Sequence, residues 1–117
     1  MSEYRTERVG RLIQEKVGTL IVEGKVKDPR VDPFLSITRV TVSRDFAYAD
    51  AYVSSYKSEG LATGVEGLQS AAGFIQSQLA KMMRLRQTPK LRFHEDQGIR
   101  EGFELVKKIE DLVRDGQ

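Results

Sequence analysis

The sequence predicts an α+β fold in which helices pack on one face of a three-stranded sheet. Two long segments carry apolar side chains at helical spacing, and two shorter segments between them are strand-like, the second with the period of two that is typical of strands. A further short strand and a final helix follow. The expected elements, in order along the chain, are a helix at 5–22, strands at 35–42 and 46–54, a long helix at 61–83, a strand at 90–94 and a helix from Ile99.

The first helix is predicted by a single apolar stripe. Its members recur at helical spacing, and the basic residues of the segment lie largely off the stripe. The next segment, 24–34, opens with Gly24 and contains two Asp-Pro pairs, which favour a connecting loop because the residue before a proline is pushed out of helical geometry. The stripe consists of Val9, Leu12, Ile13, Val17, Leu20 and Ile21.

The two central strands have different patterns. In 46–54, small apolar residues alternate with Tyr48, Asp50 and Tyr52, so the tyrosines either cover the sheet, which we favour, or stack on nucleic-acid bases. In 35–42, the apolar residues change parity between Ile37 and Val40, which predicts a bulge or a strand covered on both faces. The connection between these strands is short enough for an antiparallel hairpin.

Ala71, Ala72 and Gly73 interrupt the long helical segment at its centre. Small residues at this point have two explanations. They allow a helix to cross the sheet closely, or they form a kink between two helices that opens a helix N-terminus near Phe74 to phosphate.

Charge is distributed unevenly along the chain. Residues 1–94 have a net charge of +5 and residues 95–117 a net charge of −3. A run of basic residues after the kink has no acidic residue within it, whereas solvated helix faces typically mix both signs, so we expect a polyanion such as nucleic acid to bind there. The run consists of Lys81, Arg84, Arg86, Lys90 and Arg92.

Several classes of function are disfavoured. The chain has no cysteine and one histidine, which excludes disulfides and His-rich or Cys-based zinc sites, and we expect no metal and no cofactor. In the cluster His94, Glu95 and Asp96 we disfavour a catalytic or metal site, because adjacent strand residues do not face one point, and interpret His94 as a strand-end or loop residue. No apolar run approaches the length of a membrane span, so a cytoplasmic protein with one domain at 1–117 is expected.

Four short segments, met in order along the chain, carry a family resemblance. They are "DPR" (28–30), "SRD" (43–45) with "AYV" (51–53) after it, "AAGFI" (71–75) and "RLRQTPKLRF" (84–93). Together they resemble the ribosome-binding factor A family over about residues 4–113.

The resemblance implies a type II KH-like domain and a role without catalysis. It implies binding to the immature small ribosomal subunit and its rRNA, help with late maturation and rRNA 5′-end processing, and support of growth in the cold. It also implies an Ala-x-Gly kink at Ala71, Ala72 and Gly73, where other KH domains have a Gly-x-x-G loop, with the glycine bending the helix. Gln76 stands where the family commonly has a basic residue.

The expected mechanism is binding by charge and shape, as a monomer. The basic run would contact rRNA phosphates, which position a protein without specifying sequence. The alternative is a protein-interaction module, in which the acidic final helix (Glu101, Glu104, Glu110 and Asp111) docks on a basic ribosomal protein. The residues expected to assist the basic run are Arg5, Arg8 and Arg11 of the first helix and Arg44 of the hairpin.

Overall fold

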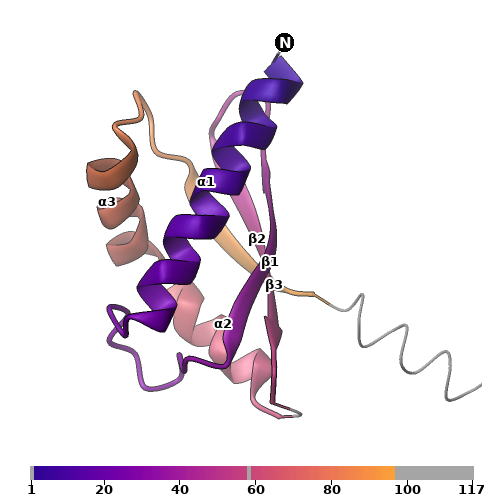
Figure 1. Ribbon diagram of the computed structural model, residues 1–117, viewed down its shortest axis with the longest axis vertical. Helices are drawn as coiled ribbons and strands as arrows, with labels where there is room; N and C mark the ends of the chain where they lie inside the picture. The colour runs from indigo at the N-terminus through magenta and orange to yellow at the C-terminus, as the bar shows by residue number, and fades with distance from the viewer. Residues whose placement is uncertain (1, 58, 97–117) are drawn as a thin grey trace, which may run out of the picture.

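The computed structural model describes residues 2–57 and 59–96. Figure 1 shows three helices on one side of a three-stranded sheet, which confirms the predicted α+β class with helices on one face. The final helix predicted from Ile99 lies outside the described residues. The elements are α1 (Ser2–Val22), β1 (Leu35–Val42), β2 (Tyr48–Ser55), α2 (Leu61–Ser70), α3 (Ala72–Met83) and β3 (Lys90–Glu95).

The strands lie in the order β1-β2-β3, with β1 and β2 antiparallel and β2 and β3 parallel. The hairpin prediction is therefore confirmed. The second strand begins at Tyr48 and not at Phe46, because residues 43–47 form the turn: Phe46 has a φ of 59° and donates its backbone N–H to the Ser43 carbonyl. The parallel β3 is reached from β2 through α2 and α3, as parallel strands require a long crossover.

A bulge in β1 resolves the change of parity seen in the sequence. The register of β1 against β2 shifts between Ile37 and Arg39, so Thr38 is the extra residue. Leu35 and Ile37 before the bulge and Val42 after it are all buried, whereas Arg39 is exposed. The bulge prediction is confirmed, and it lets one strand direct apolar side chains of both parities toward the helices.

The core lies between the sheet and the helices. Ala49, Ala51 and Val53 of β2 are completely buried, and their small side chains leave room for the helices to approach. The first helix contributes the stripe predicted for it, except that Leu12 lies at its edge and is 38% exposed. The buried apolar side chains of the helices, those of the stripe included, are Ile13, Val17, Leu20, Ile21, Leu68, Ala72, Ile75 and Leu79.

Two glycines permit the closest helix–sheet approaches. A Cβ on Gly10 of α1 would lie 2.7 Å from the Val40 carbonyl oxygen, and a Cβ on Gly64 of α2 would lie 2.8 Å from two atoms of the Leu35 side chain. Both distances are shorter than real Cβ contacts. At Gly10 the neighbour is backbone, so the position of α1 over β1 depends on this glycine. At Gly64 the neighbours are the terminal methyl groups of Leu35, so a side chain there would require Leu35 to shift.

The loop that contains Asp28, Pro29 and Arg30 is fixed on α2. Arg30 donates to both carboxylate oxygens of Asp28 and, at 3.0 Å, to the Ser70 hydroxyl. Hydrogen bonds from the Arg30 side chain and backbone lower the pKa of Asp28 to about 2, so the carboxylate stays ionised. A Cβ on Gly67 would overlap this loop. The "DPR" segment thus has a structural role in seating the loop.

Candidate nucleic-acid interface

Three segments of the chain meet at one end of the molecule. In Figure 1, the start of α1, the β1–β2 turn and the connection from α3 to β3 all lie at the top. A hydrogen bond from the Lys90 backbone N–H to the Ala47 carbonyl, 2.9 Å, joins the turn to the start of β3. We call residues 4–11, 43–47 and 81–90 the basic end.

The basic end collects most of the cations that the sequence singled out. Its eight Lys and Arg residues face only two carboxylates, Glu7 and Asp45. Hydrogen bonds from the Ser43 hydroxyl and the Ala47 backbone lower the pKa of Asp45. All eight basic side chains are exposed: Arg5, Arg8, Arg11, Arg44, Lys81, Arg84, Arg86 and Lys90.

These cations are available to a ligand. Within residues 2–57 and 59–96, seven of the eight, all except Arg44, make no ion pair. Arg84 has left-handed backbone geometry (φ 51°, ψ 40°) and ends α3, which directs the chain into the loop that carries Arg86. A concentration of unpaired cations at one end is the electrostatic pattern that favours a polyanion.

The opposite end has mixed charge. Residues 23–34 and 56–66 carry five acidic and four basic side chains, and several of them pair with one another. The positive potential is therefore concentrated at the basic end and is not spread over the molecule.

Arg92 is predicted with the basic run but lies apart from it, on the face of the sheet that the helices leave open. Its guanidinium makes two hydrogen bonds to Asp50, at 2.8 and 3.0 Å, and lies over the Tyr48 ring. Partial burial of Asp50 opposes ionisation, but hydrogen bonds from Arg92 and His94 outweigh it and lower the Asp50 pKa. The charge of Arg92 is thus largely neutralised within the protein.

The interruption of the long helix falls at Ala71. This residue has φ −88° and ψ 4°, ends α2 and precedes α3. Gly73 lies inside α3, its φ is not in the left-handed region, and a Cβ there would have no atom within 4 Å. The break between the helices therefore falls at the first of the three residues expected to form the kink, and the expectation that Gly73 itself bends the helix is wrong, because the bend occurs two residues earlier. Ala72 is buried, whereas Gly73 and Phe74 are exposed beside the turn.

Gln76 has a structural partner. Its side-chain oxygen accepts the Leu91 backbone N–H at 2.8 Å. Gln69 of α2 pairs with the same strand, since it accepts from the Phe93 N–H at 2.8 Å and donates to the Leu91 carbonyl at 3.2 Å. These two glutamines occupy the free edge of β3, and the sequence pattern had no signal for this arrangement.

His94 lies in β3. Its ring nitrogen Nε2 lies 2.8 Å from the Asp50 carboxylate, and its ring lies beside Tyr52. The described part of the chain contains no group of three potential metal-ligating side chains. None of its helices is long and apolar enough to cross a membrane.

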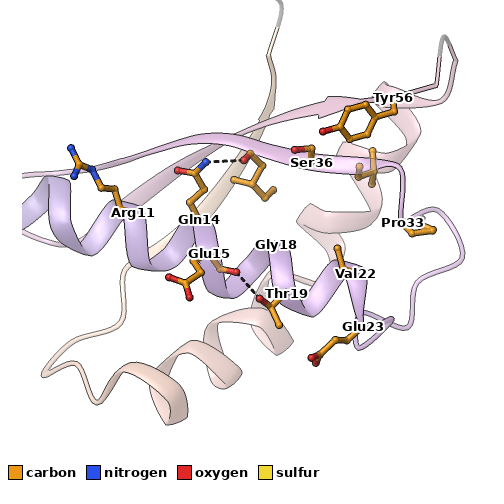
Figure 2. A pocket seen from close by; sticks show the side chains of 12 residues that line it. Arg11, Gln14, Glu15, Gly18, Thr19, Val22, Glu23, Pro33, Ser36 and Tyr56 are labelled. Atoms are coloured by element: carbon orange, nitrogen blue, oxygen red, sulfur yellow. Dashed lines mark hydrogen bonds between the residues drawn. The ribbon is translucent and has the colours of Figure 1, made fainter.

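A groove of about 590 Å³ separates α1 from β1. Figure 2 shows Gln14 reaching across it from α1 to the β1 backbone, where its amide donates to the Ile37 carbonyl at 3.1 Å. Val22 and Tyr56 lie at the rim, 72% and 83% exposed. Arg11 is the only predicted binding residue in its lining.

Comparisons with known proteins agree with this architecture. The model of the family described as ribosome-binding factor A matches residues 5–109. The chain is 50% identical to the ribosome-binding factor A of Treponema denticola over 113 residues, which cover 96% of this chain and 86% of that protein.

Two solved structures are also similar. An NMR structure of a Thermotoga maritima protein, described as a candidate ribosome binding factor A, is 34% identical with a TM-score of 0.60, covering 76% of this chain and 88% of that one. The crystal structure of ribosome-binding factor A from Thermus thermophilus has the same fold, with a TM-score of 0.65 at 22% identity over 77% of this chain and 94% of that one. The sequence match and the shared KH-like fold lead to one conclusion: the chain belongs to the ribosome-binding factor A family.

Proposed function

We propose that this protein is an assembly factor that binds the small ribosomal subunit while the subunit is being assembled. It acts through this binding and not through catalysis, as a single KH-like domain in the cytoplasm. Membership of a family named for ribosome binding supports the choice of partner. The resemblance in the sequence supports the more specific role, which is late maturation of the small subunit and of the rRNA 5′ end.

The basic end is the observation that carries the proposal. Seven exposed cations that make no ion pair within the described residues converge on one region of the surface, and they come from α1, α3, the connection after α3 and the start of β3. Phosphate contacts of this kind fix the position and orientation of a protein on folded RNA. Fit to the shape of the rRNA and of neighbouring ribosomal proteins then provides the specificity.

Co-sedimentation tests this function. The protein is centrifuged with mature small subunits, with their precursors and with large subunits, and we expect it to comigrate with small-subunit particles and most strongly with precursors. The double variant Arg84→Glu, Arg86→Glu reverses two charges at the basic end and is expected to abolish comigration without unfolding the protein, since both side chains are exposed.

The matched control places the same charge change at the opposite end. Lys25→Glu, Lys27→Glu alters two exposed lysines and should leave comigration intact. Unchanged binding of the Arg84, Arg86 variant would show that the basic end is not the interface. Binding to assembled subunits but not to naked rRNA would favour a ribosomal protein as the partner.

A further inference from the structure

Within the described residues, the helices cover one face of the sheet and leave the other uncovered (Figure 1). Side chains from all three strands converge on the uncovered face. We call them the open-face cluster: Arg39 of β1, Tyr48, Asp50 and Tyr52 of β2, and Arg92 and His94 of β3.

The cluster contains two stacks of planar groups. The Arg39 guanidinium carbon lies 4.3 Å from the centre of the Tyr52 ring, and the His94 ring centre lies 5.3 Å from the same ring, tilted by 32°. In the second stack, the Arg92 guanidinium carbon lies 4.2 Å from the centre of the Tyr48 ring. Such pairs present flat surfaces on which a base can stack.

The charge of the cluster is not balanced. Asp50 is its one carboxylate, and it is occupied by Arg92 and His94. Arg39 has no acidic partner among residues 2–57 and 59–96. Beside the cluster, Asp96 directly after β3 accepts a hydrogen bond from Thr38, and exposed Lys90 at the start of β3 adds a cation. The cations Arg39, Arg92 and Lys90 therefore outnumber the two carboxylates, and this positive charge beside a planar stack suits a nucleic-acid strand.

The apolar content of this face disfavours a protein partner. Among the large hydrophobic side chains that the described structure exposes, Tyr48 is the one that belongs to the cluster, and its ring is already covered by Arg92. The centre of a protein interface is normally apolar and depleted of charge. A surface of arginine, tyrosine and histidine lacks that character.

The cluster is continuous with the basic end. Arg11 and Arg39 line the same hollow between α1 and β1, which has a volume of about 300 Å³. At the opposite edge of the sheet, exposed Lys90 begins β3, the strand that carries Arg92. A strand of RNA held by its phosphates at the basic end could thus continue across the sheet.

We propose that the open-face cluster binds unpaired nucleotides of single-stranded RNA by stacking a base at each arginine–tyrosine pair. This inference rests on the proposed function, because it assumes an RNA partner. Tyr48 and Tyr52 are four residues apart in β2, so the stacks are separated by about 13 Å and hold different nucleotides. The cluster contributes contacts to bases, whereas the basic end contributes contacts to phosphates.

The test compares a fluorescein-labelled oligouridine strand with a blunt RNA duplex of the same length, using fluorescence anisotropy. Arg39→Lys is the main variant, because lysine keeps the charge and loses the planar group. We expect it to weaken oligouridine binding by about tenfold, with Tyr52→Leu at least as damaging, and to leave duplex binding unchanged. Arg39 is exposed, so the lysine variant should melt at the wild-type temperature.

Lys57→Ala is the matched control. Lys57 lies 4.6 Å from the centre of the Phe34 ring at the opposite end of the molecule, so it makes the same type of contact in a different place. This variant should bind oligouridine like the wild type. An equal loss from Lys57→Ala would show that the effect does not depend on the open face, and it would overturn the assignment.

The remaining outcomes separate this inference from the proposed function. Wild-type oligouridine binding by Arg39→Lys, or equal weakening of strand and duplex, would overturn the stacking role. So would a loss of binding to assembled subunits without any loss for oligouridine, since that points to a ribosomal protein. In each of these cases the Arg84, Arg86 variant still decides independently whether the basic end holds the subunit.

Discussion

The two glycines of α1, Gly10 and Gly18, differ in how closely other atoms approach them. Gly10 touches the backbone of β1, because a Cβ there would lie 2.7 Å from a carbonyl oxygen, whereas Gly18 of the same helix has no atom within 4 Å of that position. Both lie inside α1, where glycine is a poor helix former. The difference between them is therefore one of packing and not of local conformation.

Gly10→Ala and Gly18→Ala should change stability in opposite directions. The first forces α1 away from β1 and should cost about 1–3 kcal/mol of unfolding free energy. The second removes a flexible residue from a helix and should raise that free energy by up to about 1 kcal/mol. Urea unfolding measures both, and similar effects of the two substitutions would contradict the close contact at Gly10.

Residue-level predictions from the sequence succeeded where the signal was local. Parity placed Tyr48 and Tyr52 on one face and the alanines on the other. The sequence could not separate Arg92 from the other cations, because its partner Asp50 is 42 residues away and meets it only through the register of β2 with β3. The three residues Ala71, Ala72 and Gly73 were predicted to hold the kink, and the break lies at the first of them, whereas the resemblance had given the bend to Gly73.

At the scale of elements, side chains of α2 and α3 cover the outer edge of β3, where no further strand pairs within residues 2–57 and 59–96. Gln69 and Gln76 supply one donor and two acceptors to its backbone. An uncovered strand edge invites pairing with other chains, and side-chain cover prevents it. The same contacts join α2 and α3 to β3 on either side of the Ala71 bend, so they also fix the angle between the two helices.

The double variant Gln69→Ala, Gln76→Ala should destabilise the protein. The backbone N–H groups of Leu91 and Phe93 would lose their partners at a partly buried edge, at a cost of about 1–3 kcal/mol for each group. Urea unfolding and faster amide exchange at these two residues would measure the effect. Gln78→Ala, in the same helix but without a side-chain hydrogen bond, is the control, and an equally large loss there would contradict this explanation.

For the whole molecule, the position of the charges matters more than their sum. The net charge is only +2. Folding nevertheless brings α1, the β1–β2 turn and the end of α3 together, which collects eight cations from three separate segments. The linear sequence revealed the local run in 81–92 and named Arg5, Arg8, Arg11 and Arg44 as residues that assist it. Their convergence requires the topology, which reverses the chain direction between α1 and β1 and again between β1 and β2.

The salt dependence of rRNA binding should show whether affinity depends on where the charges lie or only on the net charge. With about five phosphate contacts, affinity for rRNA should fall by more than 100-fold for a fourfold rise in salt, with the slope for B-DNA as a guide. Arg84→Glu, Arg86→Glu should reduce the slope of log affinity against log salt by about 2. Lys25→Glu, Lys27→Glu changes the net charge equally and should preserve the slope, so equal slopes for the two variants would refute a localised interface.

The bulge at Thr38 determines which face of the sheet each later residue of β1 occupies. Its extra residue sets which side chains enter the core on each side of it, so that Val42 is buried and Arg39 meets Tyr52. If the eight residues of β1 paired regularly, without a bulge, every residue after Ile37 would change faces, placing Arg39 inward and the valines outward. Deletion of Thr38 itself would therefore remove the bulge and leave the same side chains on each face, whereas insertion of a residue that the strand pairs regularly would exchange them.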